Sequence, residues 1–294
     1  MKKLQAPHLK TTVVTSKDSP SYSNPVRATA LAGFFYPQPS EYVMSRKKRL
    51  KLVTSQTYIV QEEQESKHKL RSSDLKEIWS LTENQENFFN FYRKGHKAIL
   101  CHGVAGTGKT YIAMHSAFKE ILENSIYKKV VIVRSAVPSR DIGFLPGNEK
   151  EKVEIYSQPY QEICADLFPR FGAHAYNKLK EQSLIHFMVT SYVRGLTLDN
   201  CIVIVDEAQN MNDMELNSIM TRVGQNTKII FCGDFRQTDL QKRSDMSGLK
   251  KFMAIAHHMP SFRHVEFDVE DIVRGPLVKE YIIARMACED MAVA

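Results

Sequence analysis

Gly103-Val104-Ala105-Gly106-Thr107-Gly108-Lys109-Thr110 matches G-x-x-x-x-G-K-[ST], the pattern of a loop that surrounds the phosphates of a nucleotide. Its glycines let successive N–H groups point at phosphate oxygens, and the helix expected after the loop adds the positive end of its dipole. In this pattern the Lys109 ammonium reaches the β- and γ-phosphates, and the Thr110 hydroxyl binds Mg²⁺. The alternative is a plain glycine turn, which the strand expected before the loop and the helix after it disfavour.

Apolar runs without polar alternation surround this loop and predict strands that are buried on both faces. These runs are 98–101, 130–133, 186–189, 201–205 and 229–232. Helical patterns alternate with them at 109–123, 159–167, 213–223, 247–258 and 276–287. The order predicts an α/β fold with a doubly wound, mainly parallel sheet, in which ligands bind beyond the carboxyl ends of the strands.

Two adjacent acids, Asp206 and Glu207, follow the apolar run 201–205. Successive side chains of a strand point in opposite directions, so the two acids are expected to have different roles. Asp206 suits Mg²⁺ binding, as a Walker B aspartate does, and Glu207 suits activation of the attacking water. The alternative is an ordinary acidic start of the next helix. Together with the phosphate-binding loop, the pair indicates a nucleoside triphosphatase.

Gly233-Asp234-Phe235-Arg236-Gln237 follows the run that ends at Cys232. Asp234 and Gln237 are candidates for sensing the γ-phosphate of ATP. The alternative is a simple turn, for which Gly-Asp is common.

Composition excludes several classes of protein. No run approaches 18 apolar residues and no signal-peptide core follows the start, so no membrane span is expected and the chain should stay in the cytoplasm. Five cysteines without a CxxC pair argue against a disulfide framework and a zinc site.

The basic excess lies at the N-terminus. Ten Lys/Arg and two Asp/Glu give residues 1–60 a net charge of +8, so of the total of +7 the rest of the chain carries −1. The cluster Arg46-Lys47-Lys48-Arg49 could contact phosphate backbones, or it could simply be a solvated tail. Four prolines within 17–40 predict an irregular, basic extension over 1–79, followed by the nucleotide-binding domain over 80–294.

Together these motifs resemble the PhoH family of P-loop ATPases, whose core is similar to the first RecA-like domain of superfamily 1 helicases. Besides the loop and the acid pair, the resemblance rests on Gly-Phe-Leu-Pro-Gly at 143–147, Arg-Gly-Leu-Thr-Leu at 194–198 and Val-Arg-Gly-Pro-Leu-Val at 273–278. Ser135 and Gly275 depart from the usual family pattern. The short form resembles PhoH-like proteins of bacteriophages, which would place it in the host cytoplasm.

The resemblance implies further roles. Gln85 is a possible adenine contact, although Thr82-Glu83-Asn84-Gln85 also has the form of a helix capping box, which we favour. A single RecA-like domain implies a homo-oligomer, a hexameric ring by analogy, in which a neighbour donates an arginine. Arg274 is the preferred candidate over Arg222 and Arg236, with a structural ion pair as the alternative.

The main hypothesis is an ATPase that uses ATP and Mg²⁺ and couples hydrolysis to binding or unwinding of single-stranded nucleic acid, with RNA favoured over DNA. By analogy with helicases, Arg140 would contact phosphate and Phe144 would stack on bases, unless Phe144 only anchors its loop. The alternative function is an ATP-gated switch that remodels a protein partner, with slow hydrolysis and no stimulation by nucleic acid. A small-molecule kinase and a GTPase are both disfavoured.

Overall fold

A computed structural model describes residues 69–135, 149–234 and 243–293. All of them belong to one unit, which spans residues 61–294. Its centre is a six-stranded sheet in the order β3-β2-β4-β5-β1-β6, in which every neighbouring pair is parallel. The strands are β1 (Ala98–Gly103), β2 (Lys129–Arg134), β3 (Ile185–Val189), β4 (Cys201–Asp206), β5 (Lys228–Gly233) and β6 (Phe262–Phe267).

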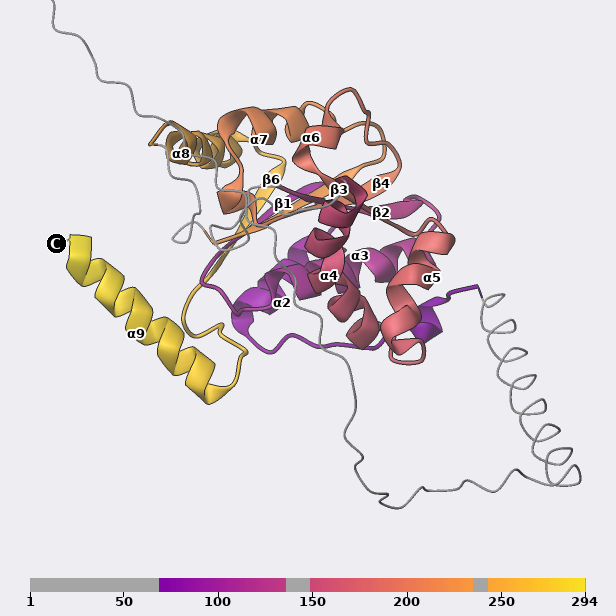
Figure 1. Ribbon diagram of the computed structural model, residues 1–294, viewed down its shortest axis with the longest axis horizontal. Helices are drawn as coiled ribbons and strands as arrows, with labels where there is room; N and C mark the ends of the chain where they lie inside the picture. The colour runs from indigo at the N-terminus through magenta and orange to yellow at the C-terminus, as the bar shows by residue number, and fades with distance from the viewer. Residues whose placement is uncertain (1–68, 136–148, 235–242, 294) are drawn as a thin grey trace, which may run out of the picture. The chain divides into compact units, whose positions relative to one another are not determined.

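Helices cover both faces of the sheet (Figure 1). One face packs against α2 (Glu83–Arg93), α3 (Lys109–Glu123), α4 (Glu149–Leu167) and α5 (Ala175–Glu181). The other packs against α6 (Thr190–Val193), α7 (Asp213–Met220) and α8 (Arg243–His258), while α9 (Pro276–Val293) follows the last strand. Three short 3-10 helices complete the described elements: η1 (Ser72–Asp74), η3 (Gly172–His174) and η4 (Ala208–Asn210). The predicted doubly wound α/β fold is confirmed.

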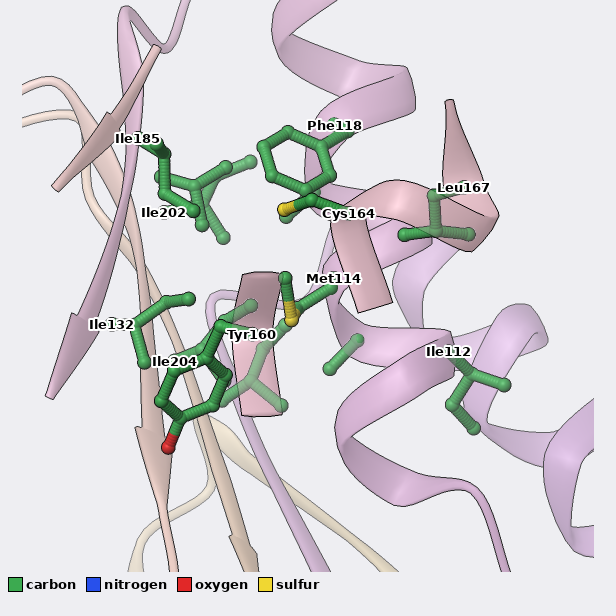
Figure 2. Close-up of a cluster of buried hydrophobic side chains, with 14 of the residues drawn as sticks. Ile112, Met114, Phe118, Ile132, Tyr160, Cys164, Leu167, Ile185, Ile202 and Ile204 are labelled. Atoms are coloured by element: carbon green, nitrogen blue, oxygen red, sulfur yellow. The ribbon is translucent and has the colours of Figure 1, made fainter. Parts of the chain in front are cut away.

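Successive side chains of β4 point to opposite faces of the sheet, and both faces are covered, which explains why the strand is apolar before Asp206. Ile202 and Ile204 belong to the core on the α3 side, whereas Val203 and Val205 belong to the core on the α7 side. Figure 2 shows Ile202 near Ile185, and Ile204 near Tyr160 of α4, whose hydroxyl points away from the other labelled side chains. By the same alternation, Asp206 is expected on the α3 side at the end of the strand.

The five predicted strands and five predicted helices are all present, but some of their bounds differ. The prediction started a helix at Pro159, because proline usually breaks a helix, yet α4 runs through this proline from Glu149. The predicted helix 213–223 ends earlier, at Met220, and Val223 instead forms a bridge with Leu198.

The prediction did not include β6, α5, the four-residue helix α6 or the three 3-10 helices. β6 lies at the edge of the sheet, where β1 is its one neighbour among the described strands. Some of its residues are buried and others are half-buried or exposed, so its sequence forms no continuous apolar run. The seven-residue helix α5 is too short to show a clear helical period.

Candidate active site

The loop between β1 and α3 has the backbone that its glycines permit. Gly103 has φ 118°, and a Cβ atom there would lie 1.9 Å from the carbonyl oxygen of Phe267, so the P-loop and β6 approach each other at this point. Gly108 has φ 81° and forms the N-cap of α3, which no side chain caps. The first turn of α3 therefore presents its N–H groups to an anion.

Lys109 lies folded over this loop. Its Nζ donates to the carbonyl oxygens of Gly103 at 3.0 Å and Val104 at 2.6 Å, and to Thr107 Oγ1 at 3.2 Å. Burial lowers the pKa of Lys109. All three acceptors are neutral, so a phosphate oxygen would offer the ammonium a stronger, charged partner at the position that the sequence predicts.

Asp206 is buried and is held from two sides. The Thr110 hydroxyl, 96 residues away in sequence, donates to its Oδ1 at 2.6 Å. The Tyr160 hydroxyl donates to its Oδ2 at 2.8 Å. Mg²⁺ prefers such oxygen donors and usually takes only one or two protein ligands beside phosphates and water. Thr110 and Asp206 therefore fit the predicted magnesium site.

Glu207 follows in a left-handed backbone conformation, with φ 51° and ψ 43°. Burial, with a smaller contribution from the neighbouring Asp206, raises the pKa of the Glu207 carboxyl. Gln209 Nε2 donates to Glu207 Oε2 at 2.5 Å, and Gln209 Oε1 accepts from the Asp234 N–H at 3.0 Å. The structure thus brings Asp234 and the acid pair into one network.

Arg134 ends β2 directly beside Asp206, with which it is in register. Burial alone would lower the pKa of the Arg134 guanidinium. The nearby Tyr160, Glu207 and Asp206 favour its charged form more strongly, so that the pKa of Arg134 is raised. Its guanidinium also lies 5.9 Å from the centre of the Tyr156 ring. The acid pair therefore has a fixed cation within its own chain.

Gln85 contacts the P-loop. Its Nε2 donates to the Thr107 carbonyl at 3.0 Å and its Oε1 accepts from the Leu81 N–H at 2.9 Å. Thr82 caps α2 as predicted, accepting from the Gln85 N–H at 3.4 Å. In a capping box the Thr82 N–H would donate to the Gln85 side chain. Gln85 Oε1 instead accepts from the Leu81 N–H, which corrects that half of the prediction. Contact of Gln85 with adenine stays a prediction.

Arg274 lies beside the P-loop of its own chain. The Val273 N–H donates to the Gly106 carbonyl at 3.1 Å, and a Cβ atom on Gly106 would lie 3.0 Å from Arg274 Cγ. Arg274 itself is exposed. This position also suits contact with a nucleotide on the same subunit, besides the predicted action across an interface.

The remaining predicted residues lie outside the described ranges. They are Gln237, Arg140, Phe144, Arg46, Lys47, Lys48 and Arg49. Within the described ranges, no helix is long and apolar enough to cross a membrane.

Sequence reasoning missed three residues of the network. Gln209 follows the acid pair within three residues, and Arg134 stands directly after a predicted strand, so both positions were available signals. Tyr160 gave none, because a tyrosine at helical spacing is more often a core residue than a partner of a strand-end acid.

Comparisons with known proteins identify relatives of this chain. The sequence model of one family, described as PhoH-like protein, matches residues 77–285. A PhoH-like protein of Bacillus subtilis (strain 168) is 39% identical over 187 residues, which cover 62% of this chain and 56% of the relative. Protein PhoH of Escherichia coli (strain K12) is 30% identical over 216 residues, which cover 72% of this chain and 59% of the relative. The chain thus spans little more than half the length of these curated relatives.

Among solved structures, the large terminase of a thermophilic bacteriophage in complex with ADP has a TM-score of 0.41 and 13% identity. The match covers 68% of this chain and 48% of the terminase chain. The SWI2/SNF2 ATPase core of Sulfolobus solfataricus in complex with dsDNA has a TM-score of 0.37 and 16% identity, over 62% of this chain and 37% of that one.

Proposed function

The chain belongs to the PhoH-like protein family, and from this premise we propose that it binds ATP with Mg²⁺ and hydrolyses it. The observation that carries the proposal is the 2.6 Å hydrogen bond between Thr110 and Asp206. It joins the phosphate-binding loop to the strand-end acid pair, and these are the two parts that a P-loop triphosphatase needs at one place.

In the proposed reaction, the N–H groups of the loop and the first turn of α3 hold the phosphates, and Lys109 neutralises charge on the β- and γ-phosphates. Thr110 and Asp206 would hold Mg²⁺, which supplies further neutralisation of the developing charge. Glu207 accepts a proton from the water that attacks the γ-phosphorus. Burial raises the pKa of Glu207, which makes it a better base.

Other residues have supporting roles in this proposal. Asp234 and Gln237 sense the γ-phosphate, and Gln85, whose Nε2 donates to the Thr107 carbonyl of the P-loop, contacts adenine. Arg274 stabilises charge in the transition state. Its place beside Gly106 of its own chain supports action on the same subunit, in preference to the trans-acting role that the sequence suggests.

We further propose that hydrolysis is coupled to single-stranded nucleic acid, with RNA favoured over DNA, in a homo-oligomeric ring of six subunits. Support for the nucleic acid comes from the charge of +8 over residues 1–60 and from the family resemblance to helicase cores, whereas the ring rests on the analogy alone. Arg140, Phe144 and the cluster Arg46-Lys47-Lys48-Arg49 are the proposed contacts.

The test is Mg²⁺-ATP turnover by the full chain, with and without single-stranded RNA or DNA, alongside Glu207→Gln and Lys109→Ala. We expect basal turnover that RNA raises, loss of turnover with retained ATP binding in Glu207→Gln, and loss of ATP binding in Lys109→Ala. Turnover that ignores both nucleic acids would favour the ATP-gated switch acting on a protein partner. Full activity in Glu207→Gln would refute the assignment of the base.

A further inference from the structure

The Gln209 side chain connects the ends of two neighbouring strands. Its Nε2 donates to Glu207 Oε2 at 2.5 Å, just after β4, and its Oε1 accepts from the N–H of Asp234, just after β5, at 3.0 Å. The residue is only 5% exposed. A buried amide with these two partners has its orientation fixed, because the donor must face the carboxylate and the acceptor must face the backbone N–H.

The backbone at Gly233 leaves space for this amide. A Cβ atom at residue 233 would lie 2.9 Å from Gln209 Oε1 and 3.4 Å from the Cβ atom of Ala208. The backbone of Gly233 is not in the left-handed region, so its conformation does not require glycine. Glycine is needed here because a side chain would collide with the Gln209 amide. The Gln209 amide is therefore packed against the end of β5 as well as bonded to it.

Glu207 needs such a partner. Its left-handed backbone takes it out of the regular strand direction, and its carboxylate is close to that of Asp206. A charge-assisted hydrogen bond to a fixed donor is a strong way of orienting a carboxylate. Without it, repulsion between the two carboxylates and the freedom of the Glu207 side chain would both move the base from its position.

We propose that Gln209 is a positioning residue, which aims the Glu207 carboxylate and ties its position to the chain at Asp234. A displacement of the Asp234 backbone would then move the amide, and with it the base. This inference rests on the proposed function, because it requires Glu207 to be the base of ATP hydrolysis. It adds the residue that couples this base to the end of β5.

Two substitutions separate the two hydrogen bonds. Gln209→Glu keeps the size and can keep the acceptor for Asp234, but it replaces the donor to Glu207 by a carboxylate oxygen. Gln209→Met has a similar length and loses both bonds. A matched control is Gln182→Met, because the Gln182 amide also accepts from a backbone N–H, that of Leu70 at 3.0 Å, but belongs to the turn after α5, away from the acid pair.

The measurements are single-turnover hydrolysis at saturating Mg²⁺-ATP, the dissociation constant of ATP, and the melting temperature, all on the full chain. We expect both Gln209 variants to hydrolyse about 10- to 100-fold more slowly, since misplacement of a catalytic group by about 1 Å has effects of that size. In Gln209→Met, which adds no charge, the dissociation constant of ATP should change by less than about twofold, because neither of these two hydrogen bonds involves the P-loop. Gln182→Met should hydrolyse at the wild-type rate.

A double-mutant cycle distinguishes positioning from general loss of structure. In a Glu207→Gln background, Gln209→Met should slow the residual hydrolysis by less than about twofold, because the base that it positions is already gone. An equal loss in both backgrounds, or wild-type hydrolysis in both single variants of Gln209, would overturn the inference. If Glu207→Gln itself hydrolyses normally, or if the wild type does not hydrolyse ATP, the proposed function fails, and the inference fails with it.

Discussion

The hydroxyl of Thr110 and the carboxylate of Asp206 meet at 2.6 Å, although 96 residues separate them in the chain. Thr110 is the second residue of α3, the helix after the P-loop, and Asp206 ends a strand that is separated from β1 by β5. The sheet order therefore places a hydroxyl and a carboxylate on the same side of the nucleotide site, and the response of the protein to Mg²⁺ should depend on this arrangement.

Removing the Thr110 hydroxyl should weaken the response to Mg²⁺. We expect Thr110→Val to need at least about tenfold more Mg²⁺ for half-maximal turnover, because outer partners and ligands of a metal typically affect affinity by about 10- to 100-fold. Thr110→Ser should stay near the wild type. Thr227→Val is the control, since the buried Thr227 hydroxyl also bonds, to the Leu198 carbonyl, but stands before β5 at the opposite end of the strands. An unchanged Mg²⁺ titration in Thr110→Val would contradict the magnesium assignment.

Tyr160→Phe should affect both stability and metal use. The ring stays packed beside Phe187, but Asp206 Oδ2 loses its donor. We expect a loss of about 1 to 2 kcal/mol in the free energy of unfolding and a several-fold higher Mg²⁺ requirement. Tyr127→Phe loses a comparable bond, from Lys97 at 2.8 Å, and should lose stability without a change in the Mg²⁺ titration. Denaturant unfolding and Mg²⁺-dependent turnover measure the two effects; equal Mg²⁺ titrations in both variants would argue against a role for Tyr160 at the site.

Gly103→Ala tests the close approach of the P-loop and β6. The new Cβ atom would collide with the Phe267 carbonyl, so we expect a loss of at least about 3 kcal/mol in unfolding free energy, together with loss of ATP binding. Gly95→Ala is a matched control, because Gly95 also has a positive φ, of 76°, but its Cβ would meet nothing within 4 Å. Its cost should be about 1 to 2 kcal/mol from backbone strain alone. Similar losses of unfolding free energy in Gly103→Ala and Gly95→Ala would mean that the backbones of the P-loop and β6 can move apart.

Mixing two inactive variants can show whether Arg274 acts on the nucleotide of its own subunit or on that of a neighbour. Arg274→Ala should lower kcat strongly with little loss of ATP binding, because arginines of this kind are worth about 10³–10⁵ in rate. Mixing it with Lys109→Ala subunits should not restore turnover if Arg274 acts on the P-loop of its own chain. Restored turnover in the mixture would instead show that the arginine acts across an interface. Unchanged kcat in Arg274→Ala would remove it from the mechanism.

His115 makes stability depend on pH. Its Nε2 lies 3.0 Å from the Lys76 carbonyl, and its buried Nδ1 has no partner among the described residues. Burial lowers the pKa of His115 below the ordinary value of 6.5. The unfolded chain then binds the proton more readily, so stability present above pH 6.5 is lost as the pH falls below it.

The corresponding substitution is His115→Gln, which can still donate to the Lys76 carbonyl. Between about pH 7.5 and about pH 5.5, its unfolding free energy should fall less steeply than that of the wild type in urea titrations. His258→Gln, at an exposed position at the end of α8, is the matched control and should keep the wild-type slope. Parallel curves for His115→Gln and the wild type would show that His115 does not contribute.

Parts of the candidate site were predictable because they depend on local geometry. The P-loop pattern needs only its own glycines, Lys109 and Thr110, and the acids at 206 and 207 follow an apolar run rich in β-branched residues, which predicts a buried strand. Strand β6 was harder to predict from the sequence. It lies at an edge of the sheet, and its sequence mixes apolar and polar residues, as in Phe262-Arg263-His264.

The amino-acid sequence by itself determined the family, the parallel α/β class and the positions of the P-loop and the acid pair. These properties follow from the periodicity of apolar residues and from contiguous motifs, which act over one strand, turn or helix. Only the tertiary structure decided that Tyr160 holds Asp206, that Gln209 joins Glu207 to Asp234, and that Arg274 lies beside Gly106 of its own chain. Such contacts depend on the order of strands in the sheet and on the direction of side chains across it, and no local pattern in the sequence specifies either.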